Sequence, residues 1–402
     1  MKKIKLICIL LLLCGCAPKI TIEEDAKLHI AVENEAYGNA IIELWDETYP
    51  ENSNAISIAV LEEHEILTSV LNDEEIPYDV FLIHDEDIAT ALDHILEIPS
   101  RLEKGFEVDI NEEFSSLIND VKNCYYPLLA EGMLYAVNTT KVKNENIELS
   151  AFDNFETLFP YANKNPLYYL DNGVINFPLL SSVTTYLPNS KTHEVNFSDE
   201  GFETSLLNFK TIFNSLDLKD DPSKFDNWFI NQEYLSGLIG SWMQASESEE
   251  YNQIVLRYQK LPMIDSYQLK TQANSAGYVI SQETKYPGAA MKLIELMHST
   301  KAMQILIDTT NLVPLVSEEQ MIDFTIEKVH QQEKMIAMNY AMQKNLLALN
   351  QLSDVSATEV LENEAIRKVI VQYIKDEIEL DQVIESCEEI KNEWLAKQIK
   401  EE

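Results

Sequence analysis

Between residues 28 and 84, the sequence alternates between short apolar runs and amphipathic segments of helical period. Strands are predicted at Leu28–Val32, Ala55–Leu61 and Tyr78–His84, and helices at Tyr37–Tyr49 and Glu62–Leu71. Strands that alternate with helices in this way are typical of a mostly parallel sheet with helices on both of its faces. The order therefore predicts an α/β fold, and it is the strongest constraint that the sequence places on the architecture.

Polar residues follow two of these strands at their carboxyl ends. Asn34 and Glu35 come after the first strand, and His84-Asp-Glu-Asp87 closes the third. In open α/β sheets, ligands bind beyond the carboxyl ends of the strands, so we expect these side chains at one rim of the sheet. No glycine-rich phosphate-binding motif follows either strand, which argues against a nucleotide. The acids after His84 lack the glycine of a calcium loop, so we interpret them as a helix start and predict no metal site and no cofactor.

The length and charge of the chain limit its partners. Its 402 residues exceed what one hydrophobic core normally holds, so two lobes are expected. Hydrophobic residues make up 46% of it, which excludes a disordered chain. The formal net charge of −38 repels nucleic acid and anionic lipid head groups, so neither is an expected partner. We interpret this charge as an aid to solubility, and we expect a monomer.

The amino-terminal segment predicts export and lipidation. Three lysines precede the apolar run Leu6–Leu13, which is too short to cross a bilayer as a permanent helix. Leu13-Cys-Gly-Cys16 then resembles a lipobox, in which Cys16 is diacylated and becomes the new amino terminus. We therefore expect residues 1–15 to be a lipoprotein signal peptide, 16–26 to be a tether, and the protein to sit on the extracellular face of the cell membrane. The alternative is an ordinary secretory signal.

The cysteines follow from this interpretation. Cys8 and Cys14 leave with the signal peptide, and Cys16 takes the lipid. Cys124 and Cys387 are left, far apart in the sequence. They can either pair or remain two buried thiols, and the second interpretation is favoured because Cys387 falls on the apolar face of a predicted helix.

Further elements are predicted along the rest of the chain. Strands are expected at Met133–Val137 and Pro166–Leu170, and helices at Phe152–Ala162, Phe177–Tyr186 and Phe202–Asn214. From Glu318 on, the pattern is helical to the end.

The stretch from Glu233 to Pro314 carries the most specific order of motifs. It contains, in turn, the strand Leu235–Ile239, the turn Gly240-Ser-Trp242, a strand ending at Leu261-Pro262, the strand Ser275–Ser281, the helix Tyr286–Ser299, and Asn311-Leu-Val-Pro314. Ser241 is expected to cap a helix that contains Trp242 in its first turn. This order resembles the carboxyl half of bacterial extracellular solute-binding proteins, in the maltodextrin-binding branch of ABC importers.

The resemblance covers nearly all of the predicted mature chain and implies its organisation. Tyr125–Asn138 resembles the segment in which such chains leave the first lobe and enter the second. The implied fold is α/β, two-lobed and periplasmic-binding-protein-like (type II), with the ligand cleft at the hinge. The lobes and crossings that it implies are an N-lobe of 27–125 plus 268–320, a C-lobe of 126–267 plus 321–402, and crossings near 125–130, 263–270 and 315–325.

The resemblance also implies a set of sugar-binding residues. Sugars are bound by aromatic rings that stack on their apolar faces and by carboxylates or amides that accept hydrogen bonds from hydroxyls. Trp242 matches the stacking tryptophan of the family, Glu131 a hydroxyl-binding glutamate, and Asp85 the aspartate after the third strand. Asn34 and Glu35 match the polar pair after the first strand. The alternatives are a core role for Trp242 and solvated loop positions for Glu131 and Asp85.

Four positions depart from the pattern of the family. Leu82, Val174 and Asn363 stand where maltodextrin binders use aromatic stackers, and Glu86 stands where they use an arginine. These departures put maltodextrin itself in question as the ligand.

The resulting expectation is a lipid-anchored solute-binding component of an ABC transporter that binds a sugar or oligosaccharide and delivers it to membrane permease subunits. The main alternative is a surface lipoprotein that keeps the fold but serves as a receptor or interaction module. A glycoside hydrolase is a third possibility, but acidic pairs are too common among 68 acidic residues to indicate catalysis. His64-Glu-Ile-Leu-Thr68 lacks the second histidine of a zinc-protease helix, so we expect no enzyme and no catalytic residues.

Overall fold

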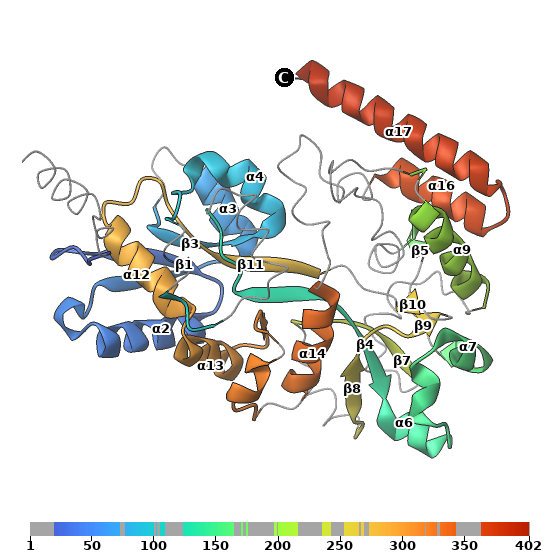
Figure 1. Ribbon diagram of the computed structural model, residues 1–402, viewed down its shortest axis with the longest axis horizontal. Helices are drawn as coiled ribbons and strands as arrows, with labels where there is room; N and C mark the ends of the chain where they lie inside the picture. Colours follow the sequence, from blue (N-terminus) through green and yellow to red (C-terminus); the bar gives the residue numbers. More distant parts are fainter. Residues whose placement is uncertain are drawn as a thin grey trace, which may run out of the picture.

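The computed structural model (Figure 1) describes residues 20–72, 77–99, 102, 105–108, 124–164, 170–171, 174–175, 197–198, 200–215, 235–242, 253–264, 267–268, 273–317, 319–327, 330–342 and 363–401. The predicted signal peptide, Cys16 and the predicted helix Phe177–Tyr186 lie outside these residues, as does most of the predicted strand Pro166–Leu170. Among the described residues, no helix is both long enough and apolar enough to cross a membrane.

The first sheet begins with three parallel strands. β1 (Leu28–Val32) lies between β2 (Ile56–Val60) and β3 (Val80–His84) and pairs in parallel with both. Every residue of β3 is buried, as expected for a short apolar run inside a parallel sheet. β11 (Ala273–Ile280) then adds to β3 in antiparallel orientation. The predicted strand–helix alternation is confirmed, and the sheet is mixed rather than wholly parallel.

Helices cover both faces of this sheet (Figure 1). α3 (Glu63–Asn72) and α4 (Ile88–Ala91) lie on one face. Three mutually contacting helices, α2 (Glu35–Thr48), α12 (Pro287–Met297) and α13 (Thr300–Thr309), lie on the other. The helices predicted from periodicity at the start of the chain and at Tyr286–Ser299 are thus confirmed, with ends shifted by one or two residues.

One long strand joins this sheet to a second one. The amino-terminal part of β4 (Leu129–Asn138) pairs with β11 and with β12 (Val313–Pro314). Its carboxyl-terminal part pairs along both edges with β7 (Ser236–Gly240) and β8 (Leu256–Gln259). The predicted strand at Met133–Val137 is confirmed but extends four residues further toward the amino terminus. Figure 1 shows β4 running between the two halves of the molecule.

Two hydrophobic cores lie on either side of this strand. Leu134 and Ala136 of β4 belong to the first core, and Tyr135 and Val137 belong to the second, because successive side chains of a strand point to opposite faces. Cys124 is buried in the first core and Cys387 in the second, so they are separate thiols rather than a disulfide pair. Burial, together with the neighbouring Glu388 charge, raises the pKa of the Cys387 thiol to about 12.

The second half of the molecule is mainly helical. Its helices are α6 (Thr139–Asn144), α7 (Phe155–Leu158), α9 (Glu200–Ser215), α14 (Gln331–Met342), α16 (Glu364–Ile374) and α17 (Leu380–Glu401). Two short antiparallel pairs accompany them, β5–β6 (Leu170–Asp171 with Val174–Ile175) and β9–β10 (Met263–Ile264 with Tyr267–Gln268). Across both halves of the molecule, short 3-10 segments lie at Pro50–Asn52, Asp85–Asp87, Leu92–His94, Leu149–Phe152, Phe159–Lys164 and Gln320–Asp323.

The predicted helix Phe152–Ala162 is wrong as a single element. α7 holds only four residues, and a 3-10 segment follows it, with non-helical backbone angles at Tyr161. Asn154 starts α7 by accepting a hydrogen bond from the Glu156 N–H, and Pro160 lacks the N–H that a longer helix would need. The predicted helix Phe202–Asn214 is confirmed as α9.

Gly277 of β11 tests how tightly the junction between the two sheets is packed. A Cβ atom at this position would lie 2.2 Å from the backbone oxygen of Tyr126, and a backbone atom cannot rotate away. We expect Gly277→Ala to lower the free energy of unfolding by about 2–3 kcal/mol.

Gly105→Ala is the matched control, measured by the same denaturant melts. The three atoms nearest to the added Cβ all belong to the Glu295 side chain, which can move, so little change is expected. Equal midpoints for Gly277→Ala and Gly105→Ala would contradict this account.

Candidate ligand-binding site

Asp85 is a buried carboxylate that ties β3 to β11. It follows β3 directly, and only 1% of it is exposed. Its Oδ2 accepts hydrogen bonds from the backbone N–H of Ser275 at 2.7 Å and from the Ser275 hydroxyl at 2.8 Å. The Ser275 hydroxyl also lies 2.9 Å from the hydroxyl of Tyr125. Asp85 is therefore not a solvated loop carboxylate. It links the end of β3 to β11 through these hydrogen bonds.

Glu131 lies beside this network. It sits on β4 opposite Asn274 of β11, and its side chain is 19% exposed. One carboxylate oxygen, Oε2, lies 3.9 Å from Nδ1 of His84, whose side chain is 8% exposed. The pKa of the Tyr125 hydroxyl is held well above its ordinary value, first by burial and then by the charges of Asp85 and Glu131. The structure thus brings Asp85 and Glu131 together around His84, Tyr125 and Ser275.

Trp242 is placed next to the same cluster by the pairing of β4 with β7. Gly240 pairs with Met133, and the Ser241 N–H then donates to the Gly132 oxygen at 2.8 Å. The Gly132 N–H donates back to the Ser241 hydroxyl at 3.2 Å. Ser241 and Trp242 form a turn after β7, so Trp242 directly follows the residue that is bonded to Gly132, and Gly132 is the neighbour of Glu131.

The indole ring of Trp242 is held close to the backbone and is open to solvent. A Cβ atom at Gly240 would lie 2.5 Å from the ring, so the ring packs over this glycine. The residue is nevertheless 49% exposed, which rules out a core role. The helix that Ser241 is predicted to cap, with Trp242 in its first turn, would extend into residues outside the description; the two residues themselves form a turn, and the Ser241 hydroxyl joins it to β4.

Asn34 and Glu35 lie at the same end of the sheet as Asp85, because β1 and β3 run in parallel. The Asn34 side chain caps α2 by accepting a hydrogen bond from the Tyr37 N–H at 2.9 Å. Glu35 is exposed in the first turn of this helix. Asn34 therefore has a structural role of its own, and Glu35 faces solvent at the rim.

Two of the four positions that depart from the family pattern serve the fold. Leu82 is buried in the first core, and the Asn363 side chain caps α16 by accepting from the Ala365 N–H. The side chains of Val174 and Glu86 lie outside the description. Within the described part of the chain, no group of three or more His, Cys, Asp or Glu side chains is arranged to hold a metal ion.

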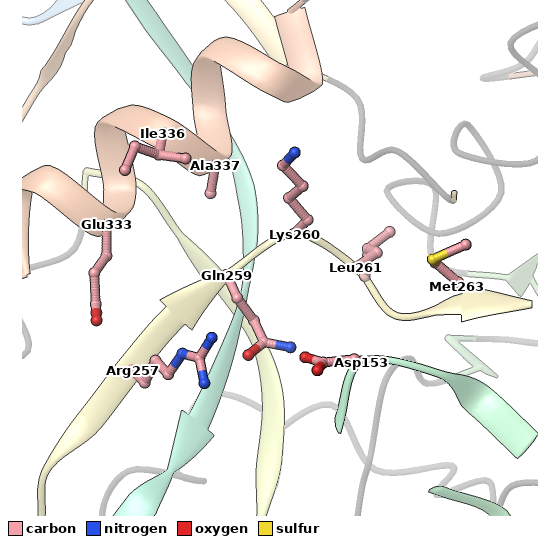
Figure 2. A pocket seen from close by; sticks show the side chains of 9 residues that line it. All are labelled: Asp153, Arg257, Gln259, Lys260, Leu261, Met263, Glu333, Ile336 and Ala337. Carbon is pink, nitrogen blue, oxygen red and sulfur yellow. The ribbon is translucent and has the colours of Figure 1, made fainter. Parts of the chain in front are cut away.

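A separate pocket of about 310 Å³ lies between β8 and α14 (Figure 2). Figure 2 shows the Gln259 side chain directed toward Asp153, with Glu333, Ile336 and Ala337 on the helix α14. Charged side chains of both signs line it, and none of the five predicted ligand-binding residues does. Its lining is Asp153, Arg257, Gln259, Lys260, Leu261, Met263, Glu333, Ile336 and Ala337.

Comparisons with known proteins identify the fold. No protein-family model matches the sequence, and no curated protein does. Among solved structures, a maltose-binding periplasmic protein from Listeria monocytogenes in complex with maltose matches with a TM-score of 0.68 and 15% identity, over 92% of this chain and 99% of that one. The chain has the fold of the maltose-binding proteins.

A second solved structure, a cyclo/maltodextrin-binding protein complexed with maltotetraose, matches equally well. Its TM-score is 0.69 at 14% identity, over 94% of this chain and 99% of that chain. The predicted two-lobed α/β fold of type II is thereby confirmed. The exact lobe boundaries and the binding residues stay predictions.

Sequence reasoning missed the residues that organise this site. Ser275, Tyr125 and Gly132 lie within predicted segments, but no local signal singles them out, and they join Asp85 and Ser241 only through the register of strands far apart in the chain. His84 was expected at the rim, but its burial was not.

Two buried histidines predict a loss of stability in mild acid. Burial lowers the pKa of His84 to about 4, and burial likewise lowers that of His298 to about 4, although hydrogen bonds from the ring to backbone atoms oppose this. The unfolded chain titrates near 6.5 and so binds more protons than the folded chain between about pH 6.5 and 4. Stability is therefore retained above pH 6.5 and falls as the pH is lowered, by about 1–2 kcal/mol per histidine at pH 5.

Denaturant melts at pH 7 and pH 5 measure this effect. The difference in the free energy of unfolding between pH 7 and pH 5 should be smaller in the double variant His84→Gln/His298→Gln than in the natural protein. His64→Gln, which removes a histidine side chain that is 75% exposed, should leave it unchanged. An undiminished difference in the double variant would refute the assignment.

Proposed function

We propose that the protein binds a sugar or oligosaccharide in the cleft between its lobes, as the solute-binding component of an ABC transporter. The observation that carries this proposal is the half-exposed Trp242 ring, which directly follows Ser241, the residue bonded to the Gly132 neighbour of Glu131. The two solved neighbours bind maltose and maltotetraose, which supports a carbohydrate ligand.

Each group in this cluster has a physical role in the proposal. The Trp242 ring offers an apolar face for a sugar ring to stack on. The partly exposed Glu131 accepts hydrogen bonds from hydroxyls, and such bonds to a charged acceptor contribute about 1.5–3 kcal/mol each. Asp85 is too deeply buried to contact a ligand, so its role is to support the site by holding β3 against β11. Asn34 and Glu35 supply polar contacts at the rim.

The same geometry favours a binding protein over a glycoside hydrolase. Glycoside hydrolysis needs two carboxyl groups placed on either side of the scissile bond. Here Asp85 is 1% exposed and its Oδ2 is engaged by Ser275, so Glu131 is left without a second acid from this pair. Both solved neighbours are likewise binding proteins.

The membrane anchor and the transport partner belong to the proposal and rest on the sequence. Lipid on Cys16 would hold the protein at the extracellular face of the membrane, and permease subunits would receive the closed, loaded form. The alternative of a receptor or interaction module is supported by Leu82 and Asn363, which serve the fold where maltodextrin binders place aromatic stackers. Genes for permease subunits beside this one would favour transport.

Removing the Trp242 ring tests the site. Trp242→Ala should weaken binding of a sugar ligand about thirty- to a hundredfold, the effect of losing an aromatic anchor of about 2–3 kcal/mol. Because the residue is half exposed, the free energy of unfolding should change by less than about 1 kcal/mol. Calorimetric titration with maltose, maltotetraose and a panel of other oligosaccharides, beside a denaturant melt, measures both effects.

Trp45→Ala is the contrasting variant, because Trp45 is fully buried. It should lower stability by about 3–5 kcal/mol. If a sugar bound Trp242→Ala as tightly as the natural protein, the cleft would lie elsewhere. If the natural protein bound none of the panel, the receptor alternative would be favoured.

Lipidation is tested at Cys16. Cys16→Ala should release the protein into the medium or leave the precursor unprocessed, because two or more acyl chains are needed for a stable anchor. Partitioning into detergent and mass spectrometry of the amino terminus measure this. Unchanged partitioning, with no fatty acid on Cys16, would disprove the anchor.

A further inference from the structure

Lys334 is a buried lysine. It lies on α14 and is 5% exposed, and its neighbours Met335 and Met338 are fully buried. Removing an ammonium group from water costs free energy unless hydrogen bonds and nearby charge or π density replace the water. The contacts that the Lys334 side chain makes therefore indicate why it is there.

Those contacts lead to the turn that carries Trp242. The Lys334 ammonium donates a hydrogen bond to the backbone oxygen of Ser241 at 3.1 Å. It also lies 5.1 Å from the centre of the Tyr258 ring on β8, at cation–π distance. Ser241 is the residue directly before Trp242.

Ser241 is thereby fixed by two separate elements. β4 holds its N–H and its hydroxyl through Gly132, and α14 holds its carbonyl through Lys334. The orientation of a carbonyl sets the peptide plane that leads into the next residue, so Lys334 constrains the direction in which the Trp242 side chain leaves the backbone. The packing of the ring over Gly240 completes this arrangement.

We propose that Lys334 is a positioning residue for Trp242, which sets the orientation of the indole for stacking on a sugar ring. The inference rests on the proposed function for its consequence in binding, but its structural part does not depend on any ligand. Replacing Lys334 by methionine would keep the apolar contacts but would leave the buried Ser241 carbonyl without this donor, so the variant tests both the fold of the turn and the orientation of the ring.

Lys334→Met measures the contribution of this hydrogen bond. We expect its denaturant midpoint to fall, because the buried Ser241 carbonyl loses a donor, and the affinity of the folded protein for an identified sugar to fall about tenfold through loss of a charged hydrogen bond that orients the stacking ring. Lys334→Arg keeps a cationic donor and should restore most of the affinity. Lys301→Met, which removes an exposed lysine on α13, is the control and should bind normally.

Acrylamide quenching of tryptophan fluorescence tests the positioning without any ligand. Each variant is compared with its own Trp242→Phe counterpart, so that the difference belongs to Trp242 alone. The quenching constant of Trp242 should rise about twofold in Lys334→Met and stay unchanged in Lys301→Met. Gly240→Ala is the positive control, because the added Cβ displaces the ring directly.

The outcomes decide between the two proposals. Normal affinity and normal quenching in Lys334→Met would overturn the positioning role, as would a loss of affinity that Lys334→Arg does not restore. If the natural protein bound no sugar, the proposed function would fail, and the quenching result alone would then confirm or reject the role of Lys334.

Discussion

The architecture depends on the hydrogen bonding of a single strand. The amino-terminal part of β4 pairs with β11 and β12, and its carboxyl-terminal part pairs with β7 and β8. Its side chains from Leu134 to Val137 alternate between two cores, so the same strand supplies part of the core in each half of the molecule. A strand that is shared in this way cannot shift its register in one sheet without shifting it in the other. This coupling fixes the position of Glu131 relative to the sheets on either side of it.

The polar groups at the junction of the two sheets are buried, and their burial requires well-placed hydrogen-bond partners. Asp85, His84 and Tyr125 are all buried, and in such surroundings a carboxylate is stabilised only by donors with good geometry. Ser275 supplies two of them from a strand 190 residues away. The carboxylate in turn limits how β11 can move against β3. The hydrogen bonds between Ser275 and Asp85 therefore both satisfy the buried carboxylate and hold β3 against β11 beside the proposed cleft.

The sequence predicted those parts of the structure that depend on local periodicity. Leu28–Val32 and Tyr78–His84 form buried parallel strands because their apolar runs have the length and composition of such strands, and α9 follows from its helical period. The prediction failed at Phe152–Ala162, where the apolar period continues but Pro160 interrupts the backbone. The site was predictable only through resemblance. Nothing local distinguishes Lys334 from a solvated lysine, since its burial depends on which face of α14 meets β4 and β8.

The two core thiols affect how this chain behaves where disulfides form readily. A thiol whose pKa is about 12 is thiolate to the extent of about one molecule in a hundred thousand at pH 7, and only the thiolate attacks a disulfide. Cys387 is therefore chemically silent toward oxidants and mixed disulfides while the protein is folded. Cys124 belongs to the other core, so joining the two would require both cores to open at once. While the protein is folded, its hinge is therefore left free of any covalent crosslink between Cys124 and Cys387.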